Sequence, residues 1–188
     1  MNPLQICNYL WLVLLVVWAV WALRAKRTQS RESLSSRLSY SLATVGGFYL
    51  ALSTDVPIPW LRTRLFPAQP SVEFLGVALT AAGVGFCIWA RAYLGGNWSG
   101  SVTVKVDHQL VRTGPYRLVR HPIYTGFLLG LLGTALVRGE VRGFLGVVVL
   151  YVGLKMKSKI EEHAMTAVFG PDYNDYSRTT GAILPRLN

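Results

Sequence analysis

The sequence predicts an all-α integral membrane protein with about five transmembrane helices. Its 188 residues are 52% hydrophobic and only 15% charged, which is too apolar for an ordinary soluble domain of this length. Apolar runs recur along the whole chain, and each one can cross all or most of a bilayer core. Basic residues gather in alternate segments between these runs, as they do in the cytoplasmic loops of membrane proteins. We therefore expect a single membrane domain over residues 1–188.

The first three expected spans cover residues 4–23, 38–52 and 72–94, within an N-terminal part that ends at residue 95. Basic residues follow the first run and a small-residue cleavage site is missing, so we expect a retained helix and not a signal peptide. The basic, Ser-rich residues 24–37 are expected to form a loop, because they cannot lie in lipid. Two prolines end the second run. Residues 60–70 are expected to lie at the membrane interface, with Trp60 as an anchor.

The last two expected spans, residues 123–137 and 141–154, are separated by only a few residues and predict a helical hairpin. Each arm is short for a full crossing, which predicts tilt or local thinning of the bilayer. Proline does not interrupt residues 141–169, so the final helix is expected to run for about 40 Å and to project into the cytosol. Gly170 and Pro171 are expected to end it.

The charge distribution predicts the orientation of the chain. Residues 24–37, 91–121 and 155–188 hold fifteen of the nineteen Lys and Arg side chains, and a five-span chain places all three segments on one side. The positive-inside rule then predicts an external N-terminus and a cytosolic C-terminus, in the plasma or inner membrane of a prokaryote or the endoplasmic reticulum of a eukaryote. The same rule accounts for the net charge of +10, so we expect no nucleic acid partner.

Two polar segments should meet on the cytosolic side: residues 97–121, with a strand-like stretch at 102–106, and the tail after the fifth span. Pro122 suits the first position of a helix, with His121 directly before it. The unpaired N–H groups of such a first turn suit the carboxylate of a cofactor, and Arg117 and Arg120 would reinforce this anion site. The alternative interpretation is a helix cap flanked by basic membrane anchors.

Two ordered blocks of motifs lie in residues 102–185. The first block reads His108-Gln-Leu-Val111, Thr113-Gly-Pro-Tyr116 and Arg120-His-Pro-Ile-Tyr124-x-Gly126. The second reads Glu161-Glu162 and Phe169-Gly-x-x-Tyr173-x-x-Tyr176. In sequence and separation the blocks resemble those of the isoprenylcysteine carboxyl methyltransferases and the related phospholipid methyltransferases. The first three spans carry no motif of that kind.

The resemblance implies a cofactor site for S-adenosylmethionine, formed by the loop before the fourth helix and the extension of the fifth. The residues that match the family's cofactor-binding elements are His108, Gln109, Leu110, Val111, Tyr116, His121, Pro122, Ile123, Tyr124 and Glu161. One helical turn before that Glu, eukaryotic members have an Arg that contacts the substrate. Here Lys157 keeps the charge but loses bidentate geometry. Lys157 and Arg120 are the expected substrate contacts, whereas for Tyr173 and Tyr176 we favour packing over a cofactor role.

The implied activity is methyl transfer from S-adenosylmethionine to the carboxylate of an isoprenylcysteine-like or other lipophilic acceptor that enters from the bilayer. An acceptor carboxylate is already ionised at neutral pH, so positioning and electrostatics are sufficient and no catalytic residue is assigned. We expect no metal, because Cys7 and Cys87 lie in apolar runs without ligand spacing. The alternatives are a lipid-amine N-methyltransferase, an NADPH-dependent reductase of the sterol type and a non-enzymatic membrane scaffold.

Overall fold

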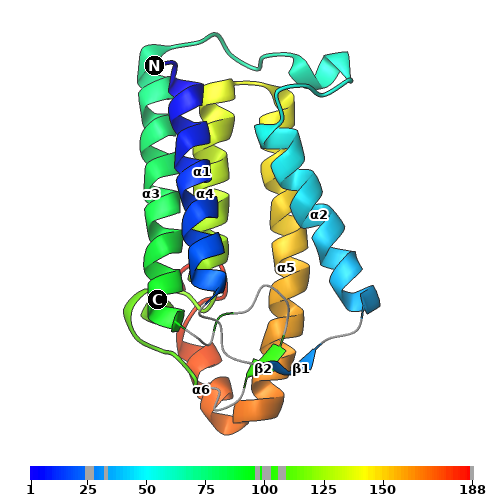
Figure 1. The fold of residues 1–188 in the computed structure, drawn as a ribbon, viewed down its shortest axis with the longest axis vertical. Coiled ribbons are helices and arrows are strands. Elements are labelled where there is room, and N and C mark those ends of the chain that lie inside the picture. Colours follow the sequence, from blue (N-terminus) through cyan, green and yellow to red (C-terminus); the bar gives the residue numbers. More distant parts are fainter. Residues whose placement is uncertain (24–27, 32–33, 96–97, 99–102, 106–108, 187–188) are drawn as a thin grey trace.

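A computed structural model describes residues 1–23, 28–31, 34–95, 98, 103–105 and 109–186. Five long helices run along the longest axis of the molecule, with short elements gathered at one end (Figure 1). The long helices are α1 (Pro3–Ala22), α2 (Leu34–Leu52), α3 (Pro70–Leu94), α4 (Pro122–Arg138) and α5 (Val141–Phe169). The short elements are 3-10 helices η1 (Pro59–Arg62) and η3 (Gly114–Arg117), strands β1 (Thr28–Arg31) and β2 (Thr103–Lys105), and helix α6 (Pro171–Thr179).

The architecture is that of an all-α membrane protein. Helices α1 and α3 have the length and hydropathy needed to cross a bilayer, whereas α4 is apolar but shorter, at 17 residues. The first four predicted spans each coincide with one long helix to within four residues at either end, and the fifth forms the first half of α5. The uninterrupted helix predicted over residues 141–169 has those bounds in the structure. At about 1.5 Å per residue, α5 is the longest rod in the fold and carries its last turns beyond the ends of its neighbours (Figure 1).

One expectation about the segments between the helices was wrong. Residues 24–37 are not simply a loop, because they contain β1, and α2 begins at Leu34, before the apolar run does. Strand β1 pairs antiparallel with β2, within the stretch expected to be strand-like. Gly170 and Pro171 end α5 as predicted, and Gly170 has a positive φ of 51° there. Pro171 then occupies the first turn of a further helix, α6.

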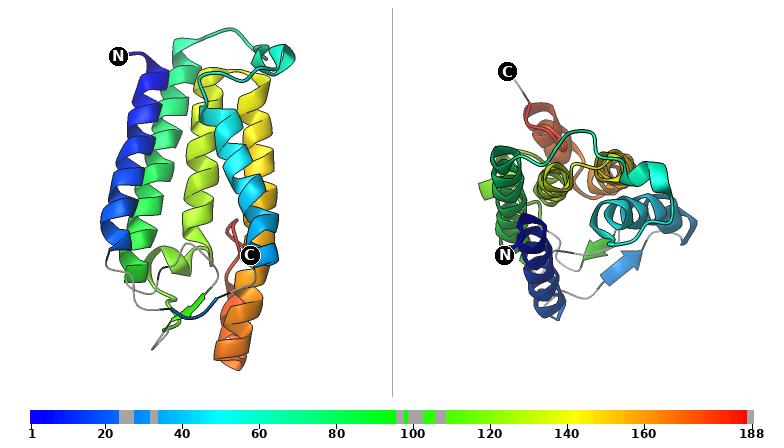
Figure 2. Two further views of the ribbon diagram at one scale, coloured as in Figure 1. Left: turned by 45° about the vertical axis from the view of Figure 1, so that its right-hand side comes forward. Right: turned by 90° about the horizontal axis from the view of Figure 1, so that it is seen from above.

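The bundle divides into two groups of helices, with α1, α3 and α4 in one and α2 and α5 in the other (Figure 2). Glycines allow close contact within each group, as is common in membrane helix packing. A Cβ atom added to Gly83 of α3 would lie 2.3 Å from the backbone nitrogen of Gly130 in α4. A Cβ atom added to Gly47 of α2 would lie 2.7 Å from the carbonyl of Gly146 in α5. The predicted hairpin of α4 and α5 therefore has a tight turn, but each arm packs most closely against an earlier helix.

The turn between α4 and α5 binds the end of α2. Gly139 has a positive φ of 67°, which permits the sharp reversal. Arg138 donates from Nε to the carbonyl of Ala51 at 3.0 Å, and Arg142 donates from Nη1 to the carbonyl of Ser53 at 2.9 Å. Both guanidinium groups, which we expected in an external loop, are buried. They satisfy carbonyl groups at the C-terminus of α2 that would otherwise lack partners.

The α3–α4 contact gives a test of the packing. Gly83→Ala should destabilise the protein, because the new methyl group would meet backbone atoms of α4. Overpacking of this kind costs about 1–3 kcal/mol, which corresponds to roughly 2–4 °C in melting temperature for each kcal/mol. Gly85→Ala is the matched control on the same helix, because nothing lies within 4 Å of its added Cβ. Equal melting temperatures for the two variants in detergent would contradict the close contact.

Candidate functional site

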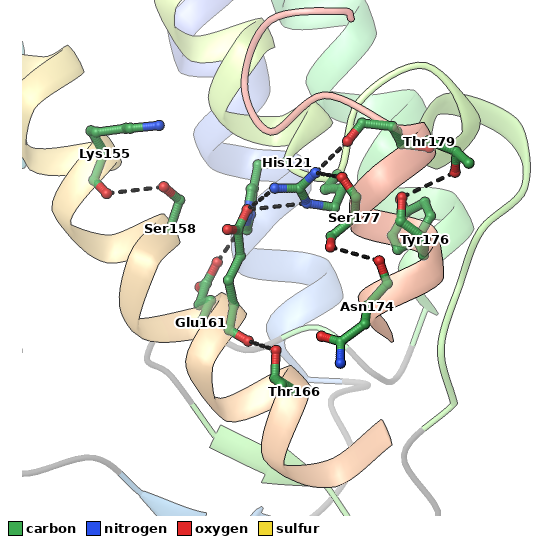
Figure 3. Close-up of polar contacts among 12 residues, drawn as sticks. His121, Lys155, Ser158, Glu161, Thr166, Asn174, Tyr176, Ser177 and Thr179 are labelled. Carbon is green, nitrogen blue, oxygen red and sulfur yellow. Dashed lines mark hydrogen bonds and ion pairs between the residues drawn. The ribbon is translucent and has the colours of Figure 1, made fainter. Parts of the chain in front are cut away.

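The candidate site forms where α4 begins. Gly114 has a positive φ of 58°, and a Cβ atom there would lie 2.3 Å from the ring of Tyr93, so the turn into η3 requires glycine. After η3, His121 occupies the N-cap of α4 and Pro122 its first position, as predicted. This geometry directs the His121 side chain toward the C-terminal extension of α5, where Glu161 lies beside it (Figure 3).

The imidazole of His121 is held between two carboxylates. Its Nδ1 lies 3.3 Å from Oε2 of Glu161, and its Nε2 lies 3.1 Å from Oε1 of Glu162. Consecutive residues on a helix point about 100° apart, since one turn takes 3.6 residues, so the adjacent glutamates can flank one ring. Both ring nitrogens donate when the imidazole is protonated, and this arrangement therefore stabilises the imidazolium form.

The ionisation of the three groups is coupled. Burial alone would lower the pKa of His121, but the hydrogen bonds and charges of Glu161 and Glu162 outweigh it and raise the pKa above the ordinary 6.5. Burial would raise the pKa of Glu161, but His121, Lys157 and Tyr124 together lower it. For Glu162, the opposing effects of burial and of bonds from His121 and Arg120 leave a pKa of about 2. The carboxylates are therefore held ionised and the imidazole is held protonated.

Tyr124 extends this cluster along α4. Its ring stacks on that of His121, with centroids 5.1 Å apart and an interplanar angle of 2°. Its hydroxyl donates to Oε1 of Glu161 at 2.7 Å. Lys157, one turn before Glu161, places Nζ 3.9 Å from the same oxygen and 5.6 Å from the centre of the Tyr124 ring. The structure thus brings together four of the predicted residues, including the expected substrate contact Lys157.

Arg120 is bound by groups of the protein. Its guanidinium donates to Oε1 of Glu162 through Nη2 at 2.7 Å and through Nε at 3.1 Å, and it also donates to the carbonyls of Ser177 and Thr180. The polar contacts around Ser177 are visible in Figure 3. Each of the three guanidinium nitrogens thus has an acceptor in the fold, and the expected role of Arg120 in substrate or anion binding stays a prediction.

The chain after α6 is hydrogen-bonded to the start of α4. The backbone N–H groups of Arg120 and His121 donate to the carbonyls of Gly181 and Ala182 at 2.8 and 3.0 Å. The Thr125 hydroxyl donates to the carbonyl of Ile183 at 2.5 Å. The backbone N–H groups of the two residues before Pro122 are therefore already paired with the tail. The N–H groups of Tyr124 and Thr125 bond to the carbonyl of His121, and the anion site expected at this helix start stays a prediction.

The other predicted residues surround this cluster at different depths. Tyr116 is buried in η3, and its hydroxyl donates to the carbonyl of Ala90 at 3.4 Å. Pro122 and Ile123 are buried, and the carbonyl of Ile123 accepts from Sγ of Cys87 at 3.3 Å. Within the other predicted element, Val111 packs on the core, Leu110 is half-buried and Gln109 is exposed. His108 lies outside the described residues.

Tyr173 and Tyr176 pack in the way we favoured from the sequence. Both are buried in α6, their rings meet edge to face at 6.0 Å, and the Tyr176 hydroxyl donates to the carbonyl of Tyr116 at 2.5 Å. Burial raises the pKa of Tyr176 to about 12, so its hydroxyl stays protonated. These contacts hold α6 against η3, beside the cluster.

Two residues of this arrangement were not assigned from the sequence. Glu162 binds both Arg120 and His121, and only its place in the acidic pair hinted at this function. Tyr40 of α2 is buried, with its ring centre 5.4 Å from Nζ of Lys157. A tyrosine among the apolar residues of a helix does not indicate a functional site, since aromatic residues at such positions usually pack in a core.

Comparison with known proteins places the chain in a family. The sequence profile of the phospholipid methyltransferases matches residues 72–172, which include α3, α4, α5 and the charged residues described above. The chain belongs to the phospholipid methyltransferase family. The match covers His121, Glu161 and Glu162 in one continuous alignment, so the cluster lies inside the region that defines the family.

Several known proteins match parts of the chain. The nickel-cobalt-cadmium resistance protein NccN of Alcaligenes xylosoxydans xylosoxydans is 30% identical over 69% of this chain and 55% of its own length. The cobalt-zinc-cadmium resistance protein CzcN of Cupriavidus metallidurans is 31% identical over the same shares. The protein-S-isoprenylcysteine O-methyltransferase of Schizosaccharomyces pombe is 35% identical over 43% of this chain and 35% of its own. The chain spans about half the length, or less, of these relatives.

Two of these relatives are named for metal resistance. Within the part of the chain that the structure describes, His, Cys, Asp and Glu side chains form no group of three or more that could hold a metal ion. Cys7 and Cys87 are fully buried, each as a small residue in the helix packing, as expected from the sequence. Charged side chains converge instead around His121.

The coupled ionisation predicts how stability depends on pH. Glu162 has a lowered pKa in the fold, so its stabilising contribution is present above about 4.5 and is lost as the pH falls toward 2. His121 has a raised pKa, so its contribution is fully present below 6.5 and is lost as the pH rises through the raised value. The melting temperature in detergent should therefore be highest between about pH 4.5 and 6.5.

Glu162→Gln should make the acid side of this curve shallower, because it removes one of the two glutamates whose pKa is lowered in the fold. Asp175→Asn is the control, since Asp175 is an exposed carboxylate of α6 whose partner, Arg178, is exposed too. The control should keep the acid decline, at roughly 2–4 °C for each kcal/mol of stability lost. An unchanged acid decline in Glu162→Gln would show that other groups control it.

Proposed function

We propose that this chain is a membrane methyltransferase that uses S-adenosylmethionine to O-methylate the carboxylate of a lipophilic acceptor of the isoprenylcysteine type. Membership of the phospholipid methyltransferase family and the names of relatives such as the Schizosaccharomyces pombe enzyme support the reaction class. The observation that carries the choice of a carboxylate acceptor is the charge and ionisation of the cluster formed by Arg120, His121, Lys157, Glu161 and Glu162. We call these five residues the charged cluster.

The described residues fit the methyl donor in part. Glu161 is an ionised carboxylate whose side chain remains 22% exposed, and it suits the ammonium of an amino-acid group. Tyr116, Ile123 and Tyr124 provide buried aromatic and apolar surface beside it. When bound, S-adenosylmethionine would supply a methyl group already activated by its sulfonium. The residues of the chain would then bind and orient the donor and the acceptor, and exclude water.

The ionisation of the cluster favours an acceptor that carries no proton. An alkyl ammonium has to lose a proton before it can accept a methyl group, and this requires a base with a pKa near the working pH. Glu161 and Glu162 have lowered pKa values, and both ring nitrogens of His121 face these carboxylates, so none of the three groups is well placed to take a proton from an amine. A carboxylate with an ordinary pKa is ionised already at neutral pH.

The net charge of the charged cluster also favours a carboxylate acceptor. With His121 protonated, the charged cluster carries three positive and two negative groups, a surplus of one positive charge. An ammonium would add charge of the same sign to this half-buried site, whereas a carboxylate would neutralise the surplus. A lipid-amine acceptor is the second candidate, because the family that matches the chain is named for phospholipid methylation.

We also propose that all five long helices span the membrane, with residues 1–95 and 96–188 forming one membrane domain and the charged cluster at the cytosolic end. The distribution of Lys and Arg supports this orientation, and the acceptor would reach the cluster from the bilayer. A membrane-impermeant thiol reagent applied to right-side-out vesicles should label Thr63→Cys but not Ser177→Cys. Labelling of Ser177→Cys alone would reverse the orientation.

Binding of the donor product tests the cofactor site. Purified protein should bind S-adenosylhomocysteine in a calorimetric titration, and Glu161→Gln or His121→Ala should weaken that binding at least about tenfold, since a charged hydrogen bond is worth 1.5–3 kcal/mol. Glu73→Gln is the matched control, because Glu73 lies in the first turn of α3, at its opposite end from the cluster. Absence of binding to the wild type would rule out the proposed function.

The pH dependence of methyl transfer tests the acceptor. The rate with N-acetyl-S-farnesylcysteine, a carboxylate, should change less than about threefold between pH 6 and 8, because this acceptor is ionised throughout. The rate with an amine acceptor such as phosphatidylethanolamine would instead rise about tenfold for each pH unit below the pKa of the amine. Labelled product released by mild base as a methyl ester would identify O-methylation. Transfer to the amine alone would favour the second candidate.

A further inference from the structure

Lys157 lies between two tyrosine rings that belong to different helices. Its ammonium nitrogen is 5.4 Å from the centre of the Tyr40 ring of α2 and 5.6 Å from the centre of the Tyr124 ring of α4. Tyr40 is 4% exposed and the Lys157 side chain 13% exposed. Aromatic faces attract a cation at such distances, and more strongly where water is excluded. Helix α2 thus reaches the charged cluster through an aromatic side chain.

Lys157 makes the longest ion pair of the charged cluster. Arg120 is 2.7 Å from Glu162, and His121 is 3.1 and 3.3 Å from the two carboxylates. Lys157, in contrast, is 3.9 Å from Glu161. Of the three cations of the cluster, its ammonium is therefore the one least neutralised by Glu161 and Glu162. A ligand anion that approaches this ammonium meets the least competition from the two carboxylates.

A lysine ammonium keeps a fixed position only where neighbouring groups restrict it. Its ammonium is a compact charge on a flexible stem of four carbons, without the rigid fork of an arginine. Tyr124 is already fixed by its stacking on His121 and its bond to Glu161. Tyr40 contacts the ammonium from α2 and completes the enclosure. These two rings limit the positions that the Lys157 ammonium can take.

We propose that Tyr40 is a positioning residue for the acceptor: together with Tyr124 it holds the Lys157 ammonium where that charge meets the carboxylate of an anionic lipid-linked acceptor. This inference rests on the proposed methyltransferase function. It assigns a function to α2, which lies before the residues matched by the family and carries no family motif. Tyr40 acts on the acceptor through Lys157 and makes no contribution to donor binding.

Steady-state kinetics of the full chain with N-acetyl-S-farnesylcysteine test the proposal. Tyr40→Leu, which removes the ring, should raise the KM for the acceptor about 5- to 30-fold, the equivalent of a cation–π contact of roughly 1–2 kcal/mol. Its kcat and its affinity for S-adenosylhomocysteine should stay near the wild-type values. Tyr40→Phe retains the ring and should stay within about threefold of the wild-type KM. Tyr49→Leu is the matched control, because Tyr49 lies on the same helix but is exposed.

A double-mutant cycle separates positioning from general loss of structure. In a Lys157→Met background, Tyr40→Leu should raise the acceptor KM no further, because the residue through which it acts is gone. An equal rise in both backgrounds, a fall in kcat alone, or a parallel loss of S-adenosylhomocysteine affinity would overturn the function of Tyr40. These outcomes leave the methyltransferase activity intact. A wild type that binds no S-adenosylhomocysteine and methylates neither acceptor would instead overturn the proposed function itself.

Discussion

The imidazolium of His121, held between Glu161 and Glu162, is the contact on which the site end of the molecule depends. It joins the first residue before α4 to the extension of α5, which are otherwise separated by the length of a helical hairpin. Each partner of this ring also binds other residues. Glu162 binds Arg120, and through it the chain after α6, while Glu161 receives Tyr124 and Lys157. A neutral imidazole could donate to only one of the two carboxylates, so the ionisation states and the geometry support one another.

Apolar and polar contacts stabilise different parts of the bundle. Glycines bring α3 close to α4 and α2 close to α5, where dispersion between backbones replaces side-chain interdigitation. The two groups of helices meet through aromatic rings, such as Trp11 against Phe48 at 5.4 Å. Polar contacts then join the groups at both ends: Arg138 and Arg142 cap α2 at one end, and the charged cluster with Tyr40 closes the other. The site therefore lies where polar contacts join the two groups of helices.

Much of this arrangement could be predicted from the sequence, and the failures have physical causes. Apolar runs and prolines predicted the long helices to within a few residues, because lipid leaves few alternatives to a helix. Helix spacing also placed Lys157 and Glu161 on one face. The function of Arg120 could not be predicted, because its partners are backbone carbonyls at Ser177 and Thr180, and every residue has such a group. Tyr40 was missed because its contact with Lys157 depends on how α2 packs on α5, which no local pattern specifies.

The hydrogen bonds between the chain after α6 and the start of α4 also order the events of biosynthesis. The carbonyls of Gly181 and Ala182 are made about sixty residues later than the N–H groups of Arg120 and His121 that they bind. A nascent chain can insert its apolar helices and still hold an unfinished cluster, with the Arg120 guanidinium lacking its carbonyl acceptors. Helix α6 and the chain after it complete the site once the bundle has formed. Any chain whose synthesis stops early would thus present an open, positively charged helix start to quality control.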